Sequence, residues 1–91
     1  MGGGFRYHTA ILEELASHGI RPTPETDPAF VREYLSDLYR YEIRQLKARL
    51  LQQEFPRGEY AGRVRELRRK YVLLSTSPDR WVTSGADRGL Q

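Results

Sequence analysis

The sequence predicts an all-α protein, a three-helix antiparallel bundle with a long central helix at about residues 28–55 and a short C-terminal turn. Three observations support this fold class. The five prolines fall outside the interiors of three stretches with helical periodicity. Within those stretches, apolar residues recur every three or four positions, as on the buried face of a helix. The connections between them are short, which makes neighbouring helices antiparallel.

The first helix is expected over residues 7–18, where apolar side chains form one amphipathic stripe. The stripe consists of Tyr7, Ile11, Leu15 and His18, with Leu12 beside it. Gly19 followed by Ile20 has the sequence of a Schellman C-cap, in which glycine takes the left-handed conformation. Pro22 and Pro24 then exclude helix from the connector, because each also restricts the residue before it.

The second helix is expected to begin after Asp27, a favourable N-cap residue, with Pro28 at the first helical position. No glycine or proline follows until Pro56, so the helix can extend to Phe55. At 1.5 Å per residue it would be about 42 Å long. Such a helix would form the spine of a small domain.

This long helix carries two apolar stripes, which predicts that it is covered on two sides. The first stripe comprises Leu35, Tyr39, Ile43, Leu46 and Leu50. The second stripe is confined to the N-terminal half and comprises Phe30, Tyr34, Leu38 and Tyr41. We expect the first and third helices to provide the two coverings.

The third helix is expected after Pro56, Arg57 and Gly58, and it has the most regular apolar stripe in the chain. The stripe consists of Tyr60, Val64, Leu67, Tyr71 and Leu74. Ser77 and Pro78 then predict a capped single turn that returns the lone Trp81 to the bundle. We expect one helical domain over residues 1–82, with a flexible start over 1–5 and a disordered tail over 83–91.

Composition indicates a folded protein that remains in the cytoplasm. Of the 91 residues, 38% are hydrophobic and 30% are charged, a balance typical of globular domains. The absence of cysteine excludes a disulfide framework and a thiolate metal site. The longest apolar run is Val72-Leu73-Leu74, far below the roughly 20 residues of a membrane span. We therefore expect no membrane association.

No arrangement of residues in the sequence predicts catalysis, a cofactor or a metal site. His8 and His18 would lie about 80° apart and nearly three turns apart on one helix, so they cannot share an ion. Glu33 and Asp37 share a helix face, but Arg40 and Arg44 continue that face, which indicates a charge-mixed solvated surface. None of the usual phosphate-loop, dinucleotide or hydrolase motifs occurs. The sequence therefore predicts that the protein is not an enzyme.

Arginine supplies 13 of the 15 basic residues, and the net charge is +3. On the expected third helix, Arg65, Arg68 and Arg69 share a face opposite the apolar stripe. This face could bind phosphates or an acidic protein surface, and it is also typical of an ordinary solvated helix. A helix-turn-helix DNA-binding motif does not fit, because the second helix is far too long.

The six tyrosines are the other unusual feature, since tyrosine suits thin cores and protein interfaces alike. Their positions on stripes favour the core for Tyr34, Tyr60 and Tyr71, whereas Tyr39 and Tyr41 flank Arg40 and are expected to be partly exposed. The candidate interaction residues are therefore Tyr39, Tyr41, Arg40, Arg44, Arg65, Arg68 and Arg69.

Two functions from different classes fit these features. The first is a non-enzymatic helical protein–protein interaction module, acting as a small subunit, an adaptor or a homodimer. The second is a nucleic-acid-binding or regulatory protein that uses the arginine-rich third helix. A protein partner or a second copy is favoured over nucleic acid.

One segment resembles a known family, the short bacterial helical-hairpin oligomerisation modules of the SHOCT type. The similar features are Leu46, Leu50 and Leu51, a turn, Glu59-Tyr60 and a closing Leu73-Leu74. In the turn, the glycine and aliphatic residue typical of the family are not matched, and Phe55-Pro56-Arg57-Gly58 stands there instead. The resemblance covers a third of the chain and implies a helical hairpin there.

Overall fold

The computed structural model describes residues 4–83 and is mostly helical, with three α-helices and one short antiparallel strand pair. Three single 3₁₀ turns connect or follow the helices, at Arg57–Glu59, Val72–Ser75 and Pro78–Trp81. The main elements, in chain order, are β1 (Arg6–Tyr7), α1 (Thr9–Ala16), α2 (Pro28–Leu51), α3 (Tyr60–Lys70) and β2 (Val82–Thr83).

The long central helix is confirmed as α2, and it begins where the sequence predicts. The Asp27 side chain accepts a hydrogen bond from the Ala29 N–H at 2.9 Å, so it caps the first turn. The helix ends at Leu51, however, before the predicted Phe55. Gln53 takes a left-handed φ of 60°, and the Glu54 N–H donates to the Arg49 carbonyl at 3.0 Å, which closes a Schellman-type end.

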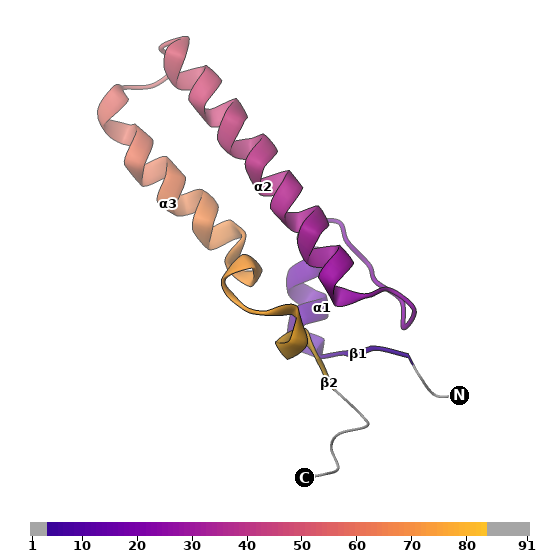
Figure 1. Cartoon of the computed structure of the whole chain (residues 1–91). Helices are drawn as coiled ribbons and strands as arrows, with labels where there is room; N and C mark the ends of the chain where they lie inside the picture. The colour runs from indigo at the N-terminus through magenta and orange to yellow at the C-terminus, as the bar shows by residue number, and fades with distance from the viewer. Residues whose placement is uncertain (1–3, 84–91) are drawn as a thin grey trace.

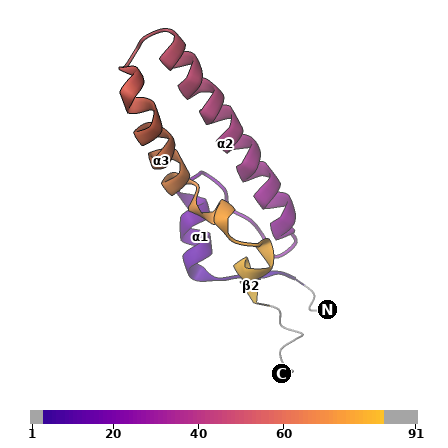
Figure 2. The same ribbon diagram turned by 60° about the vertical axis from the view of Figure 1, so that its left-hand side comes forward.

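A three-helix bundle is not confirmed, because the helices do not share a common length. α2 and α3 lie side by side as a long hairpin, whereas α1 lies at the end of the molecule that holds the termini (Figure 1). Figure 2 shows the same arrangement from a second direction. The overall dimensions are 55 × 22 × 17 Å, so the hairpin extends as an arm beyond α1.

The first helix is shorter than predicted, since it spans eight residues and starts only at Thr9. Tyr7 lies instead in β1, where it pairs with Val82 of β2. Its hydroxyl donates to the Thr26 carbonyl at 2.6 Å, which attaches the strand to the connector. The predicted Schellman end is confirmed, because Gly19 has φ 77° and the Ile20 N–H donates to the Leu15 carbonyl at 3.0 Å.

The main core lies at the α1 end of the molecule. Its buried members come from α1, α2 and the segment after α3, namely Leu15, Val31, Leu35, Tyr71, Leu73 and Trp81. The predicted turn is confirmed, since the Ser77 side chain accepts from the Asp79 N–H and returns Trp81 to the core. The Trp81 indole N–H donates to the Thr76 hydroxyl at 3.0 Å, which satisfies its one polar group.

The hairpin arm has a thinner interior of its own. Leu46 and Phe55 are its buried hydrophobic residues, and the Arg63 guanidinium lies 4.1 Å from the centre of the Phe55 ring. α3 ends at Lys70, so Tyr71 and Leu74 of the predicted helical stripe lie beyond the helix. Tyr71 nevertheless remains in the core, because the following 3₁₀ turn continues the chain back towards α1.

The predicted flexible start and disordered tail lie largely outside the described residues. Thr83, predicted to begin the tail, belongs to β2 and pairs with Arg6. Phe5, predicted to belong to the start, donates its N–H to the Pro24 carbonyl at 2.7 Å. Across residues 4–83, every helix is too short or too polar to traverse a lipid bilayer.

Candidate interaction surface

The second apolar stripe of α2 is exposed. Phe30, Tyr34 and Tyr41 have exposed fractions of 67%, 50% and 55%, respectively. Leu38, between them on the same face, is half-buried and contacts the edge of the core. We call the surface formed by Phe30, Tyr34, Leu38 and Tyr41 the aromatic stripe. It is exposed because α1 is only about two turns long, and its one buried residue, Leu15, packs in the core with Val31 and Leu35 instead.

A hollow of about 290 Å³ lies beside the N-terminal half of the aromatic stripe. Its walls are Phe30, Val31 and Tyr34 of α2 and the connector that leads from α1 to α2. Ile20 and Pro22 contribute apolar side chains from the connector, and Arg21 and Thr26 complete the rim. The hollow therefore offers an apolar recess next to two exposed rings.

One flank of the aromatic stripe carries acidic residues towards the start of α2 and basic residues further along it. Glu33 and Asp37 come first along α2, and Arg40 and Arg44 follow on the same side of the helix. All four side chains are exposed, and Arg40 contacts Asp37 with an N–O distance of 2.9 Å. Because both partners of this pair are solvent-exposed, it holds the two side chains together only weakly. The flank thus has an acidic half and a basic half.

The structure separates Tyr39 from the other α2 residues predicted to interact. Tyr41, Arg40 and Arg44 are exposed at or beside the aromatic stripe. Tyr39 is half-buried and packs against the core, with its ring edge-on to Tyr71 at a centroid distance of 5.5 Å. Tyr34 shows the opposite difference, because it was predicted to be a core residue and is half exposed.

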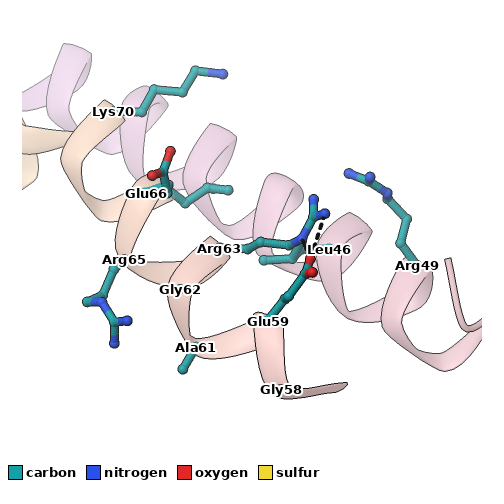
Figure 3. Close-up of a pocket in the computed structure, with 11 residues that line it drawn as sticks. Leu46, Arg49, Gly58, Glu59, Ala61, Gly62, Arg63, Arg65, Glu66 and Lys70 are labelled. Atoms are coloured by element: carbon teal, nitrogen blue, oxygen red, sulfur yellow. Dashed lines mark hydrogen bonds and ion pairs between the residues drawn. The ribbon is translucent and has the colours of Figure 1, made fainter. Parts of the chain in front are cut away.

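Arg65, Arg68 and Arg69 form a second exposed surface, along α3. Arg69 approaches Glu66 at 3.8 Å, whereas Arg65 and Arg68 have no ion pair among residues 4–83. In Figure 3 the Arg65 side chain projects away from α2, while Arg63 turns to meet Glu59. The three predicted arginines therefore share one outward surface, remote in sequence from the aromatic stripe.

An open groove of about 750 Å³ lies between the two helices of the arm (Figure 3). Leu46 and Arg49 of α2 line one side, and Gly62, Arg63 and Leu67 of α3 line the other. Its rim alternates in charge, because Glu59 and Glu66 lie among the arginines. The groove thus mixes apolar and oppositely charged groups and favours no single ligand charge.

A tight cluster of titratable groups joins the helices. The Glu42 carboxylate accepts hydrogen bonds from the Tyr71 hydroxyl and, at 3.0 Å, from Lys70 Nζ. Partial burial acts to raise the pKa of Glu42, but the hydrogen bonds from Tyr71 and Lys70 outweigh it and hold this pKa below its usual value. Burial, followed by the contact with Glu42, raises the pKa of the Tyr71 phenol well above its usual range.

His18 belongs to the same cluster through packing. Its ring stacks on Tyr71 at a centroid distance of 4.6 Å, and its Nε2 is buried without a hydrogen-bond partner in the part of the chain described. Within that part, no three histidine, aspartate or glutamate side chains gather closely enough to hold a metal ion. The cluster is best explained as the polar joint between α2 and the segment after α3.

Comparisons with known protein families, curated proteins and solved structures found no match, so the resemblance of residues 46–74 to SHOCT modules receives no support from them.

Proposed function

We propose that the protein is a non-enzymatic helical interaction module whose docking surface is the aromatic stripe of α2. The observation that carries this proposal is the exposure of Phe30, Tyr34 and Tyr41 along one helix face. Contiguous exposed apolar surface of this kind is typical of interaction sites, and tyrosine is enriched at the centres of interfaces.

The energy of covering this surface supports a docking role. An aromatic side chain has about 150–250 Å² of surface, so each of the three rings exposes on the order of 100 Å². At about 25 cal/mol per Å², covering each ring would contribute roughly 2–3 kcal/mol before the entropic cost of association. The hollow beside Phe30 and Tyr34 adds a recess in which an anchor side chain of the partner can be buried.

The non-enzymatic part of the proposal rests on the placement of the groups best suited to catalysis. His18 stacks on Tyr71, and the Glu42 carboxylate is engaged by two donors at the joint between helices. These contacts give both groups a structural role. The partner is a protein, either another chain or a second copy of this one.

A nucleic-acid-binding function is the second candidate, and one observation favours it. Arg65 and Arg68 are exposed and lack ion pairs within residues 4–83, so both guanidinium groups can contact phosphates. Binding through them should weaken steeply between about 50 and 200 mM salt. Replacement of both by alanine should reduce that salt dependence, and failure to bind at low salt would exclude this function.

Site-specific photo-crosslinking separates the two candidates. A photoreactive amino acid is introduced at Tyr34 or, in a matched protein, at Arg65, and each is expressed in the cells that make the protein. The docking proposal predicts a discrete protein adduct from position 34 that disappears when Tyr41→Ala is added. Adducts with nucleic acid from position 65 alone would support the second candidate, and no adduct from position 34 would contradict the first.

A further inference from the structure

We infer that the partner of the aromatic stripe is a second copy of this chain, paired through α2 in an antiparallel, two-fold symmetric arrangement. The inference rests on the proposed docking function and specifies its occupant. The charged flank of the stripe provides the main argument. In an antiparallel pair of identical helices, the same flank of each copy faces its counterpart with the order of residues reversed.

Reversal places the acidic half of the flank against the basic half of the second copy. If Tyr34 of one copy lies level with Tyr41 of the other, Glu33 comes within about 3 Å, along the axis, of the position level with Arg44. The same register gives Asp37 an equally small offset from Arg40 of the second copy. Long arginine side chains span such offsets, so two pairs of opposite charges form on each side of the dyad.

The contact between Asp37 and Arg40 within one copy does not oppose this pairing. Both side chains are more than 60% exposed, so the internal ion pair is weak and exchanges readily. A parallel two-fold pair would instead place the charged flanks of the two copies on opposite sides of the interface, where they do not meet. Only the antiparallel orientation gains the ion pairs between the flanks, and this gain favours it.

The hollow beside the stripe gives the second copy a recess to fill. In the register described, Tyr41 of one copy lies level with Tyr34 of the other, and Tyr34 is part of the wall of the hollow. An apolar cavity of about 150 Å³ accepts benzene, so a hollow of about 290 Å³ accommodates a phenol ring. Symmetry repeats the insertion, so each copy contributes one Tyr41 and one hollow.

The size of the surface sets the expected strength of pairing. Stable interfaces bury about 800 Å² on each partner, whereas the three exposed rings supply roughly 300 Å² and the flanking residues part of the remainder. We therefore expect a reversible dimer that dissociates in the micromolar range. Its population should rise with protein concentration and fall with added salt, because the flank contributes through charge.

A charge-exchange experiment tests the pairing with two double variants. Arg40→Glu with Arg44→Glu makes the whole flank acidic, and Glu33→Arg with Asp37→Arg makes it basic. All four positions are exposed, so both variants should fold, as circular dichroism will verify. Arg65→Glu with Arg68→Glu on α3 is the matched control, because it changes net charge as much as the acidic variant but leaves the flank intact.

The dimerisation of each protein is measured by sedimentation velocity at low salt. We expect each flank variant alone to dimerise at least tenfold more weakly than the wild type and a 1:1 mixture of the two to recover a mixed dimer. The α3 control should dimerise like the wild type. A mixture that stays monomeric, flank variants that dimerise normally, or a wild type that is monomeric throughout would overturn the inference. In the last case, a crosslink from position 34 to a different protein would leave the docking function standing.

Discussion

The Tyr71 hydroxyl donates a hydrogen bond to the Glu42 carboxylate, and this contact joins the segment after α3 to the middle of α2. Lys70 reaches the same carboxylate, His18 stacks on the Tyr71 ring, and Tyr39 meets that ring edge-on. Groups from the end of α1, from α2 and from the α3 side thus meet at one point. This joint is where the arm is attached to the core of the molecule.

Replacing Tyr71 by phenylalanine should destabilise the protein by about 1 kcal/mol, since it removes one donor from a partly buried carboxylate but keeps the ring in place. Tyr34→Phe is the matched control, because Tyr34 is half exposed and its hydroxyl should be hydrated. Urea unfolding at pH 7 measures the free energy of unfolding of both variants. Equal free energies of unfolding for the two variants would contradict the assigned role of the Tyr71 hydroxyl.

The joint also predicts a dependence of stability on pH. The pKa of Glu42 is lower in the folded protein than its usual value of 4.5, so the ionised carboxylate stabilises the fold. This contribution is complete above the unfolded pKa and is lost as the pH falls through the folded pKa. The difference in unfolding free energy between the wild type and Glu42→Gln should therefore shrink between pH 6 and pH 3. The shrinkage corresponds to the uptake of at most one extra proton on unfolding.

Urea titrations of both proteins at several pH values measure this difference. Glu33→Gln serves as the control, because Glu33 is exposed and belongs to the charged flank instead of the joint. A difference between wild type and Glu42→Gln that does not change with pH would show that the carboxylate is not held by its donors.

Gln53→Gly should stabilise the protein by roughly 0.5–1 kcal/mol. Gln53 has φ 60°, a left-handed conformation that glycine adopts without the steric cost of a side chain. Gln52→Gly is the control, since Gln52 has φ −87° and gains nothing from glycine. Thermal unfolding compares the two variants, and a Gln53→Gly protein no more stable than Gln52→Gly would argue against the helix end seen here.

Local signals in the sequence predicted the parts of the fold that depend on neighbouring residues. The cap at Asp27, the glycine end at Gly19 and the turn that begins at Ser77 are confirmed, because their hydrogen bonds close within a few residues. The end of α2 was placed too late, since a glutamine at position 53 carries no turn signal. The pairing of β1 with β2 was missed because its two-residue strands lie at opposite ends of the chain.

The candidate site was predicted only in part, because exposure is a property of the whole fold. The sequence reveals the stripe of Phe30, Tyr34, Leu38 and Tyr41, but not whether another helix covers it. α1 proved too short to do so, which left Phe30 and Tyr34 as surface residues that sequence reasoning missed. Tyr39 carried a usable signal, since it belongs to the same stripe as the buried Leu35.

The exposure of the two tyrosines on opposite sides of α2 predicts different responses to truncation. Tyr34→Ala should lower the free energy of unfolding by only about 1–2 kcal/mol, because half of the residue is already exposed. Tyr39→Ala should cost about 2–4 kcal/mol, because its ring packs against Tyr71 and the core. Denaturant titrations at low protein concentration, where association is negligible, compare the two. Equal losses would contradict the assignment of Tyr34 to the surface.

The most direct test of the docking surface is hydroxyl-radical footprinting of the tyrosines, read by mass spectrometry. The oxidation rates of Tyr34 and Tyr41 are measured relative to buried Tyr71, first in dilute purified protein and then inside the cells that make it. We predict that Tyr34 and Tyr41 are oxidised readily in the dilute protein and are protected in cells, where the partner covers the aromatic stripe. Equal oxidation of both tyrosines in the two settings would show that nothing docks on the stripe and would contradict the proposed function.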